Sequence, residues 1–138
     1  METINYNEIE ATKNPHGVEA KKIHETNYVQ AAHICLKSGQ KLIKHITPVD
    51  VFFYVLEGTG TVEIGDEIKE VSKDTLIVSP SNIPHGWSNN SNFDLRLLVV
   101  PALVLAGIPK ENVPIGVMRR KHTLGRNYIK EINRGLEN

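Results

Sequence analysis

Residues 39–60, GQKLIKHITPVDVFFYVLEGTG, carry the clearest pattern in the chain. Glycines stand near both ends, and a mostly polar run delivers His45. The apolar run 51–56 follows and closes on the turn residues 57–60. A continuous apolar run of this length between turn residues is typical of a strand that is covered on both faces. This stretch therefore predicts a loop that delivers a histidine into a buried strand.

Residues 74–89, DTLIVSPSNIPHGWSN, have the same organisation. An apolar run leads into a loop with two prolines, and His85 follows directly after Pro84. Each stretch thus places one histidine where a loop enters a strand. What the sequence can say about function depends on whether His45 and His85 meet in the fold.

Short strands separated by turn residues are expected along most of the chain, because apolar residues alternate in short segments. The expected strands are residues 29–36, 51–56, 61–64, 68–71, 75–78, 85–87 and 95–100. No segment before residue 100 has the spacing of a helix. Many short strands at close spacing predict an all-β sandwich or small barrel.

The two ends of the chain differ from this central region. Residues 1–28 are polar and are expected to form an N-terminal arm with one edge strand. Residues 104–138 form a basic C-terminal extension in which Tyr128, Ile129 and Ile132 could line one face of a short helix. We interpret this extension as a solvated tail or as a segment that packs across a dimer partner.

The composition of the 138 residues excludes several classes of protein. Sixteen basic and sixteen acidic side chains give a formal net charge of zero, which points to neither a nucleic-acid nor an anionic-membrane partner. Cys35 is the single cysteine, so a disulfide framework is excluded and a reducing compartment is indicated. No signal-peptide pattern and no membrane-spanning run is visible. We expect a cytoplasmic protein.

The two histidine-bearing stretches resemble the paired motifs of the cupin superfamily. Gly39, His45 and Gly58 have the spacing of the first motif, in which the family has a glycine, two histidines, a glutamate and a glycine. The second motif matches at Pro80, Asn82, His85 and Asn89, with Asn82 at a glycine position and Asp74 at the preceding glycine position.

This resemblance covers residues 29–103 and implies a cupin barrel, a double-stranded β-helix of jelly-roll type. It also implies a homodimer, since small cupins generally pair through their edge strands. Cupins include oxygenases, isomerases, lyases and binding modules, so the resemblance is far less specific for function than for fold.

In the family, two histidines and a glutamate from the first motif and a histidine from the second hold a divalent metal. The resemblance therefore implies that His45 and His85 hold Fe, Mn, Ni or Zn. Thr47 stands at the second histidine position and Val51 at the glutamate position, so half of the usual ligands are missing. Asp50 is a candidate third ligand, although strand alternation points it away from the interior unless a bulge turns it. The alternative is a turn residue whose carboxylate binds backbone N–H groups.

Thr47, Val51, Phe53 and Trp87 are expected to line a pocket at the barrel mouth. His16 is expected at the surface, and His33 and Cys35 are expected to face away from the core. Three functions remain open. The chain could be a metal-dependent oxygenase or isomerase-type cupin that acts on or senses a small polar molecule. It could also be a metal-free cupin that binds or isomerises a small ligand, or a non-catalytic scaffold.

Overall fold

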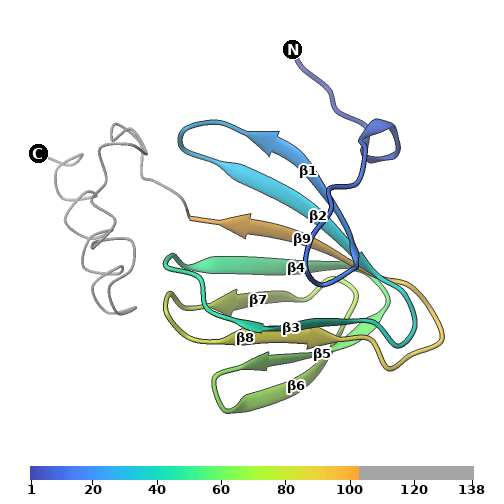
Figure 1. Cartoon of the computed structure of the whole chain (residues 1–138), viewed down its shortest axis with the longest axis vertical. Helices are drawn as coiled ribbons and strands as arrows, with labels where there is room; N and C mark the ends of the chain where they lie inside the picture. The colour runs from blue at the N-terminus through green and yellow to red at the C-terminus, as the bar shows by residue number, and fades with distance from the viewer. Residues whose placement is uncertain (103–138) are drawn as a thin grey trace, which may run out of the picture.

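Two antiparallel sheets face each other and enclose the core (Figure 1). The computed structural model describes residues 1–102. The five-stranded sheet has the order β1-β2-β9-β4-β7, and the four-stranded sheet has the order β3-β8-β5-β6. The elements are η1 (Tyr6–Glu8), β1 (Glu19–Glu25), β2 (Gln30–Leu36), β3 (Lys41–His45), β4 (Val51–Glu57), β5 (Thr59–Ile64), β6 (Glu67–Ser72), β7 (Leu76–Ser79), β8 (His85–Ser88) and β9 (Leu95–Pro101). This all-β arrangement of two antiparallel sheets is the fold class that the sequence predicts.

The core is built by the inward face of each strand. On β4, Val51, Phe53 and Val55 are buried, whereas the residues between them are only half-buried. The prediction that this strand is covered on both faces is therefore wrong for the described residues. The outer face of the neighbouring β7 also leaves Leu76 and Val78 about half exposed. The core residues are Val18, Leu36, Leu42, Val51, Phe53, Val55, Val62, Val71, Trp87, Leu95 and Leu97.

Every strand that the sequence predicts is present, and one strand was missed. The missed strand is β3, whose sequence Lys-Leu-Ile-Lys-His buries only Leu42. One buried residue in five does not produce the alternation from which a strand is recognised. The predicted C-terminal extension and its short helix lie outside the described residues.

A bulge in the pairing of β3 with β8 positions the first histidine. Leu42 pairs with Trp87 and His45 pairs with His85, so two residues of β3 face only Gly86 of β8. A Cβ atom on Gly86 would lie 3.0 Å from the Leu42 carbonyl oxygen. The bulge thus needs the absence of a side chain on β8 at this point, and it brings His45 opposite His85.

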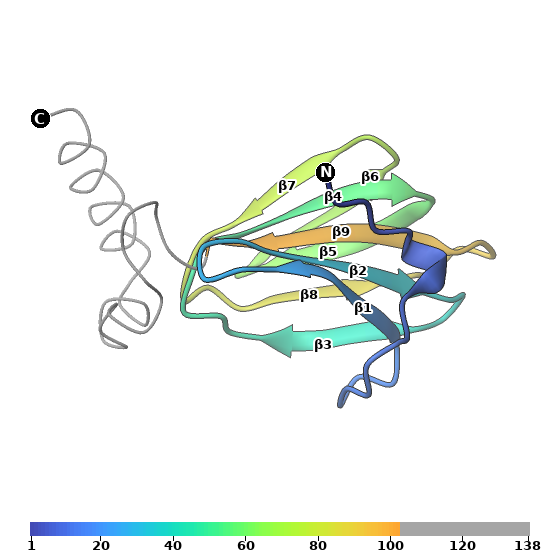
Figure 2. The same ribbon diagram turned by 90° about the horizontal axis from the view of Figure 1, so that it is seen from above.

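The N-terminal arm folds back along the barrel. Its strand β1 is one of the two edge strands of the five-stranded sheet and pairs with β2 (Figure 2). The Thr12 N–H donates to the Ala20 carbonyl at 2.8 Å, and Gly17 takes a positive φ in the turn between them. The arm therefore brings residues 12–20 to the end of the barrel where β3 begins its bulge.

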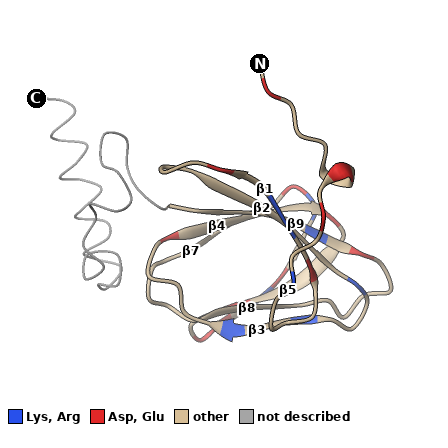
Figure 3. Ribbon diagram, turned by 45° about the horizontal axis from the view of Figure 1, so that its top comes forward, with Lys and Arg blue, Asp and Glu red and all other residues tan. Residues whose placement is uncertain are grey.

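Basic and acidic residues are interspersed along the described part of the chain (Figure 3). Four of the pairs they form are Lys22–Glu25, Lys37–Asp94, Lys44–Glu63 and Arg96–Glu57. Within residues 1–102, no helix has the length and apolar character needed to cross a membrane.

Candidate functional site

His45 and His85 meet at one end of the barrel. They are cross-strand partners, and their ring centroids lie 4.6 Å apart with an interplanar angle of 81°. The His85 side chain is buried, and the His45 side chain is exposed at the mouth. The two histidine-bearing stretches of the sequence thus converge on one site.

A cavity of about 260 Å³ lies against this pair between the two sheets. The structure places Thr47, Val51, Phe53 and Trp87 in its lining. The Phe53 ring is edge-on to His85 at 5.3 Å and to Trp87 at 5.4 Å between centroids. The remaining lining residues are Asn14, His16, Val18, Ala20, Ile34, Leu42, His45, His85, Gly86, Val99 and Pro101. Most of the cavity wall is apolar, and the His16 and His85 rings both lie close to the His45 ring.

His85 is held as a neutral imidazole. Its Nδ1 atom lies 2.7 Å from the Ser79 hydroxyl oxygen, and both side chains are buried. Burial removes the water that would stabilise a charged ring and, with a smaller contribution from nearby His45, lowers the pKa of His85 to about 4. At neutral pH His85 therefore carries no charge and offers a hydrogen-bonding nitrogen.

His45 has its orientation fixed by a backbone carbonyl. Its Nδ1 atom lies 3.1 Å from the Ile43 carbonyl oxygen. A carbonyl oxygen can only accept, so Nδ1 carries the proton and the neutral ring has its lone pair on Nε2. That lone pair could bind a metal, accept a hydrogen bond or take up a proton.

His16 is a lining residue that the sequence did not reveal. It was expected at the surface, but it is half-buried, lines the cavity and lies 5.5 Å from the His45 ring between centroids. Its Nδ1 atom accepts the Ile43 N–H at 3.2 Å. Because its partner is a backbone group of a distant strand, no residue pattern near the Pro15–Gly17 turn could have indicated the contact.

Asp50 lies outside the lining of this cavity. Its Oδ1 atom accepts the Ser81 backbone N–H at 2.8 Å, which ties the start of β4 to the loop that precedes His85. A carboxylate that accepts a backbone N–H was the alternative to metal binding that the sequence left open for Asp50, and this bond is of that kind. Thr47 faces the cavity, but its hydroxyl donates to the Val49 carbonyl at 3.1 Å.

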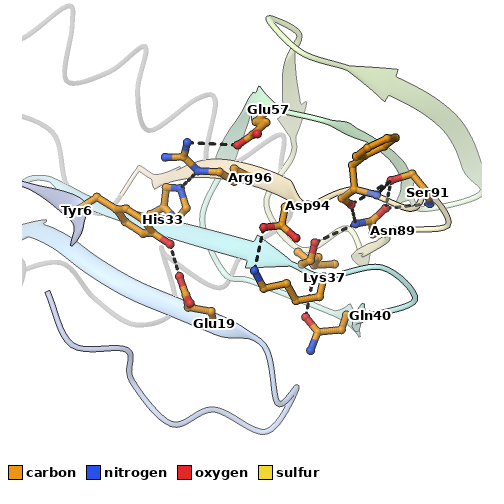
Figure 4. Close-up of polar contacts among 12 residues, drawn as sticks. Tyr6, Glu19, His33, Lys37, Gln40, Glu57, Asn89, Ser91, Asp94 and Arg96 are labelled. Atoms are coloured by element: carbon orange, nitrogen blue, oxygen red, sulfur yellow. Dashed lines mark hydrogen bonds and ion pairs between the residues drawn. The ribbon is translucent and has the colours of Figure 1, made fainter. Parts of the chain in front are cut away.

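A second polar cluster lies on the outer face of β2, under the arm (Figure 4). Arg96 Nε donates to His33 Nε2 at 3.0 Å, and the Tyr6 ring packs on His33 with centroids 3.8 Å apart. Tyr6 also donates to Glu19. His33 and Cys35 face away from the barrel interior as predicted, yet both are buried. The sequence missed the burial of His33 because its cover comes from Tyr6 of η1, far away along the chain.

The donor set does not fit a resident divalent metal. Among residues 1–102 no three His, Cys, Asp or Glu side chains are grouped so that they could hold a metal ion. Such metals usually take three or more protein ligands, and His45 and His85 provide two. His16 Nδ1 is engaged by a donor, so its Nε2 carries the proton and cannot coordinate while that bond persists.

A match to a family model decides the classification. The model of the cupin domain matches residues 32–101, which contain both histidines and all the strands from β3 to β9. The chain belongs to the cupin family. No curated protein sequence matches it.

Several solved structures are similar to this chain. The protein TT1209 from Thermus thermophilus is 27% identical, with a TM-score of 0.65, over 74% of this chain and 97% of that chain. A predicted oxalate decarboxylase from Thermotoga maritima is 22% identical, with a TM-score of 0.68, over 75% of this chain and 100% of that chain. KdgF from a Halomonas species is 19% identical, with a TM-score of 0.65, over 74% of this chain and 94% of that chain. At identities this low, the last two show a common fold alone.

Proposed function

We propose that this cupin binds a small molecule in the cavity between its sheets, with His45 and His85 as principal polar contacts. The observation that carries the proposal is the pairing of the two imidazoles, 4.6 Å apart, beside a largely apolar cavity of about 260 Å³. Small-molecule sites commonly combine apolar walls with a few converging polar groups. The cavity volume lies slightly below the range of roughly 300–1,000 Å³ for ligand pockets, so the ligand is small.

An isomerase-type proton transfer is the second candidate. His45 offers a lone pair on Nε2 in its neutral form, because Nδ1 donates to the Ile43 carbonyl. A neutral imidazole with a free ring nitrogen is an effective general base when it reaches an acidic C–H or O–H group. A binding protein and an isomerase would use the same side chains here. Only the conversion of a bound molecule to product would distinguish the isomerase.

The metal binding that the resemblance implies remains a proposal, in which the metal binds together with a small molecule. Two imidazoles would hold Fe, Mn, Ni or Zn weakly, and a bound molecule would have to supply further donor atoms. We therefore expect metal affinity to rise when a chelating molecule is present. The predicted homodimer also remains a proposal, and light scattering coupled to size-exclusion chromatography tests it.

A thermal-shift screen with a cavity-filling variant tests the binding proposal. Ala20 lines the cavity, so Ala20→Leu places three further carbon atoms in it. Ala31 belongs to the outward-facing set of β2 and lies outside the lining, so Ala31→Leu is the matched control. We expect compounds that raise the melting temperature of the wild type and of Ala31→Leu but not of Ala20→Leu. If no compound shows this pattern, the cavity is not a ligand site and the scaffold interpretation remains.

A further inference from the structure

Ile43 holds two imidazoles of the site in opposite tautomers. It lies in the bulge of β3, between Leu42 and His45 in the pairing with β8. Its N–H donates to His16 Nδ1 at 3.2 Å, and its carbonyl oxygen lies 3.1 Å from His45 Nδ1. A backbone N–H can only donate and a carbonyl can only accept, so each contact dictates where the ring proton sits.

The two rings therefore present different groups at their other nitrogen. The neutral His16 ring has its proton on Nε2 and is a hydrogen-bond donor there, whereas the neutral His45 ring has a lone pair on Nε2 and is an acceptor. Both residues line the cavity, and their centroids are 5.5 Å apart. A donor and an acceptor thus stand side by side at the same end of the cavity.

Among the other polar side chains of the lining, His85 Nδ1 is hydrogen-bonded to the Ser79 hydroxyl, and the buried Trp87 Nε1 has no hydrogen-bond partner within residues 1–102. Asn14 and Thr47, in contrast, are engaged with the backbone. Asn14 donates to the Val18 carbonyl at 2.7 Å and accepts the His16 N–H at 3.0 Å. The Thr47 hydroxyl donates to the Val49 carbonyl. Of the residues that the structure describes, no Lys, Arg, Asp or Glu lines the cavity. An anion moved from water into such a wall would lose its hydration without gaining an opposite charge.

We propose that His16 is a third ligand-binding residue beside His45 and His85, and that the cavity takes an uncharged, largely apolar molecule with at least one hydrogen-bond acceptor and one donor. A small hydroxy-carbonyl compound has this chemistry, with its carbonyl oxygen on His16 and its hydroxyl on His45. This inference rests on the proposed function, and it separates this cavity from a site for a small dianion such as oxalate.

The tautomers can be measured on the ligand-free protein. Long-range ¹H–¹⁵N correlation spectra of the imidazole rings distinguish a protonated from an unprotonated nitrogen. We expect His16 to carry its proton on Nε2 and His45 to carry its proton on Nδ1 at pH 7.5. A His16 ring protonated on Nδ1 would overturn the inference, because Nε2 could then donate nothing to a ligand.

The ligand class is tested with four probes of nearly equal size: benzaldehyde, benzyl alcohol, toluene and benzoate. The wild type should bind benzaldehyde and benzyl alcohol more tightly than benzoate. His16→Ala should weaken benzaldehyde about five-fold, the effect of one neutral hydrogen bond, and leave toluene unchanged. His16→Gln, which keeps an N–H donor, should recover part of the loss. His24→Ala, at an exposed position of β1, is the control for changes in the arm.

The outcomes separate this inference from the proposed function. Tightest binding of benzoate, or equal binding of all four probes by the wild type and His16→Ala, would overturn the inference and leave the cavity a ligand site. If none of the four probes bound while other compounds still stabilised the wild type but not Ala20→Leu, the inference would fail and the proposed function would stand.

Discussion

Asp74 and Asn82 adopt left-handed backbone conformations, with φ of 68° and 62°. Both stand at positions where the cupin motif has glycine, so the sequence located the sites where this conformation is needed. Asp and Asn tolerate it better than other residues with a side chain. At the residue scale the motif thus predicts backbone geometry as well as the place of His45 and His85. It could not predict the role of His16, whose partner is the backbone of Ile43.

Replacement of Asp74 separates the backbone requirement from the side-chain contact with Tyr54. Asp74→Gly and Asp74→Ala both remove the carboxylate, but only Gly adopts a positive φ without strain. We expect Asp74→Ala to be less stable than Asp74→Gly by about 1 kcal/mol in urea unfolding. Equal stability of the two variants would show that the conformation is not retained in solution.

Among the elements, the β4–β5 connection and the β2–β3 turn use glycine for different reasons. Gly39 and Gly58 both have positive φ, at 81° and 85°. A Cβ atom on Gly39 would meet nothing within 4 Å, whereas one on Gly58 would lie 2.3 Å from the Asp94 carbonyl oxygen. The sequence indicates both turns equally well, but the close approach of the β8–β9 connection to Gly58 is visible only in the fold.

Alanine substitutions at these two glycines should therefore have unequal effects. Gly39→Ala should cost about 1 kcal/mol, the conformational strain alone. Gly58→Ala adds a clash with backbone that cannot rotate away, and we expect it to cost at least about 2 kcal/mol more. The free energies of unfolding from urea titrations measure both changes, and similar costs at the two positions would contradict the close packing at Gly58.

On the scale of the whole molecule, the N-terminal arm contributes to both the cluster around His33 and the cavity beside His45. Nothing in the sequence indicated that these two sites share a segment. Tyr6 covers His33 on the outer face of β2, and His16 enters the cavity on the other side. Burial, together with the nearby Arg96 guanidinium, lowers the pKa of His33 to about 4. The alternation of side chains along a strand predicts which face His33 occupies. It does not predict that a remote segment of the chain buries that face.

The buried His33 should make stability depend on pH. Between about 4 and the unfolded value near 6.5, the unfolded chain binds more protons than the native chain. The free energy of unfolding should therefore fall as the pH drops from about 6.5 to 4, by at most about 3 kcal/mol for this residue. His33→Gln keeps an acceptor for Arg96 and should flatten this part of the profile, as measured by urea unfolding at several pH values. An unchanged profile in the variant would contradict the assignment.

The central claim is that the paired histidines belong to a small-molecule site rather than to a resident metal centre. Elemental analysis of the protein purified without a histidine tag tests it most directly, with His45→Ala and His85→Ala measured alongside. We expect the wild type to contain Fe, Mn, Ni and Zn far below one atom per chain. We also expect it to bind each added metal only weakly in the absence of a chelating molecule. Near-stoichiometric metal that is lost in both variants would contradict the account.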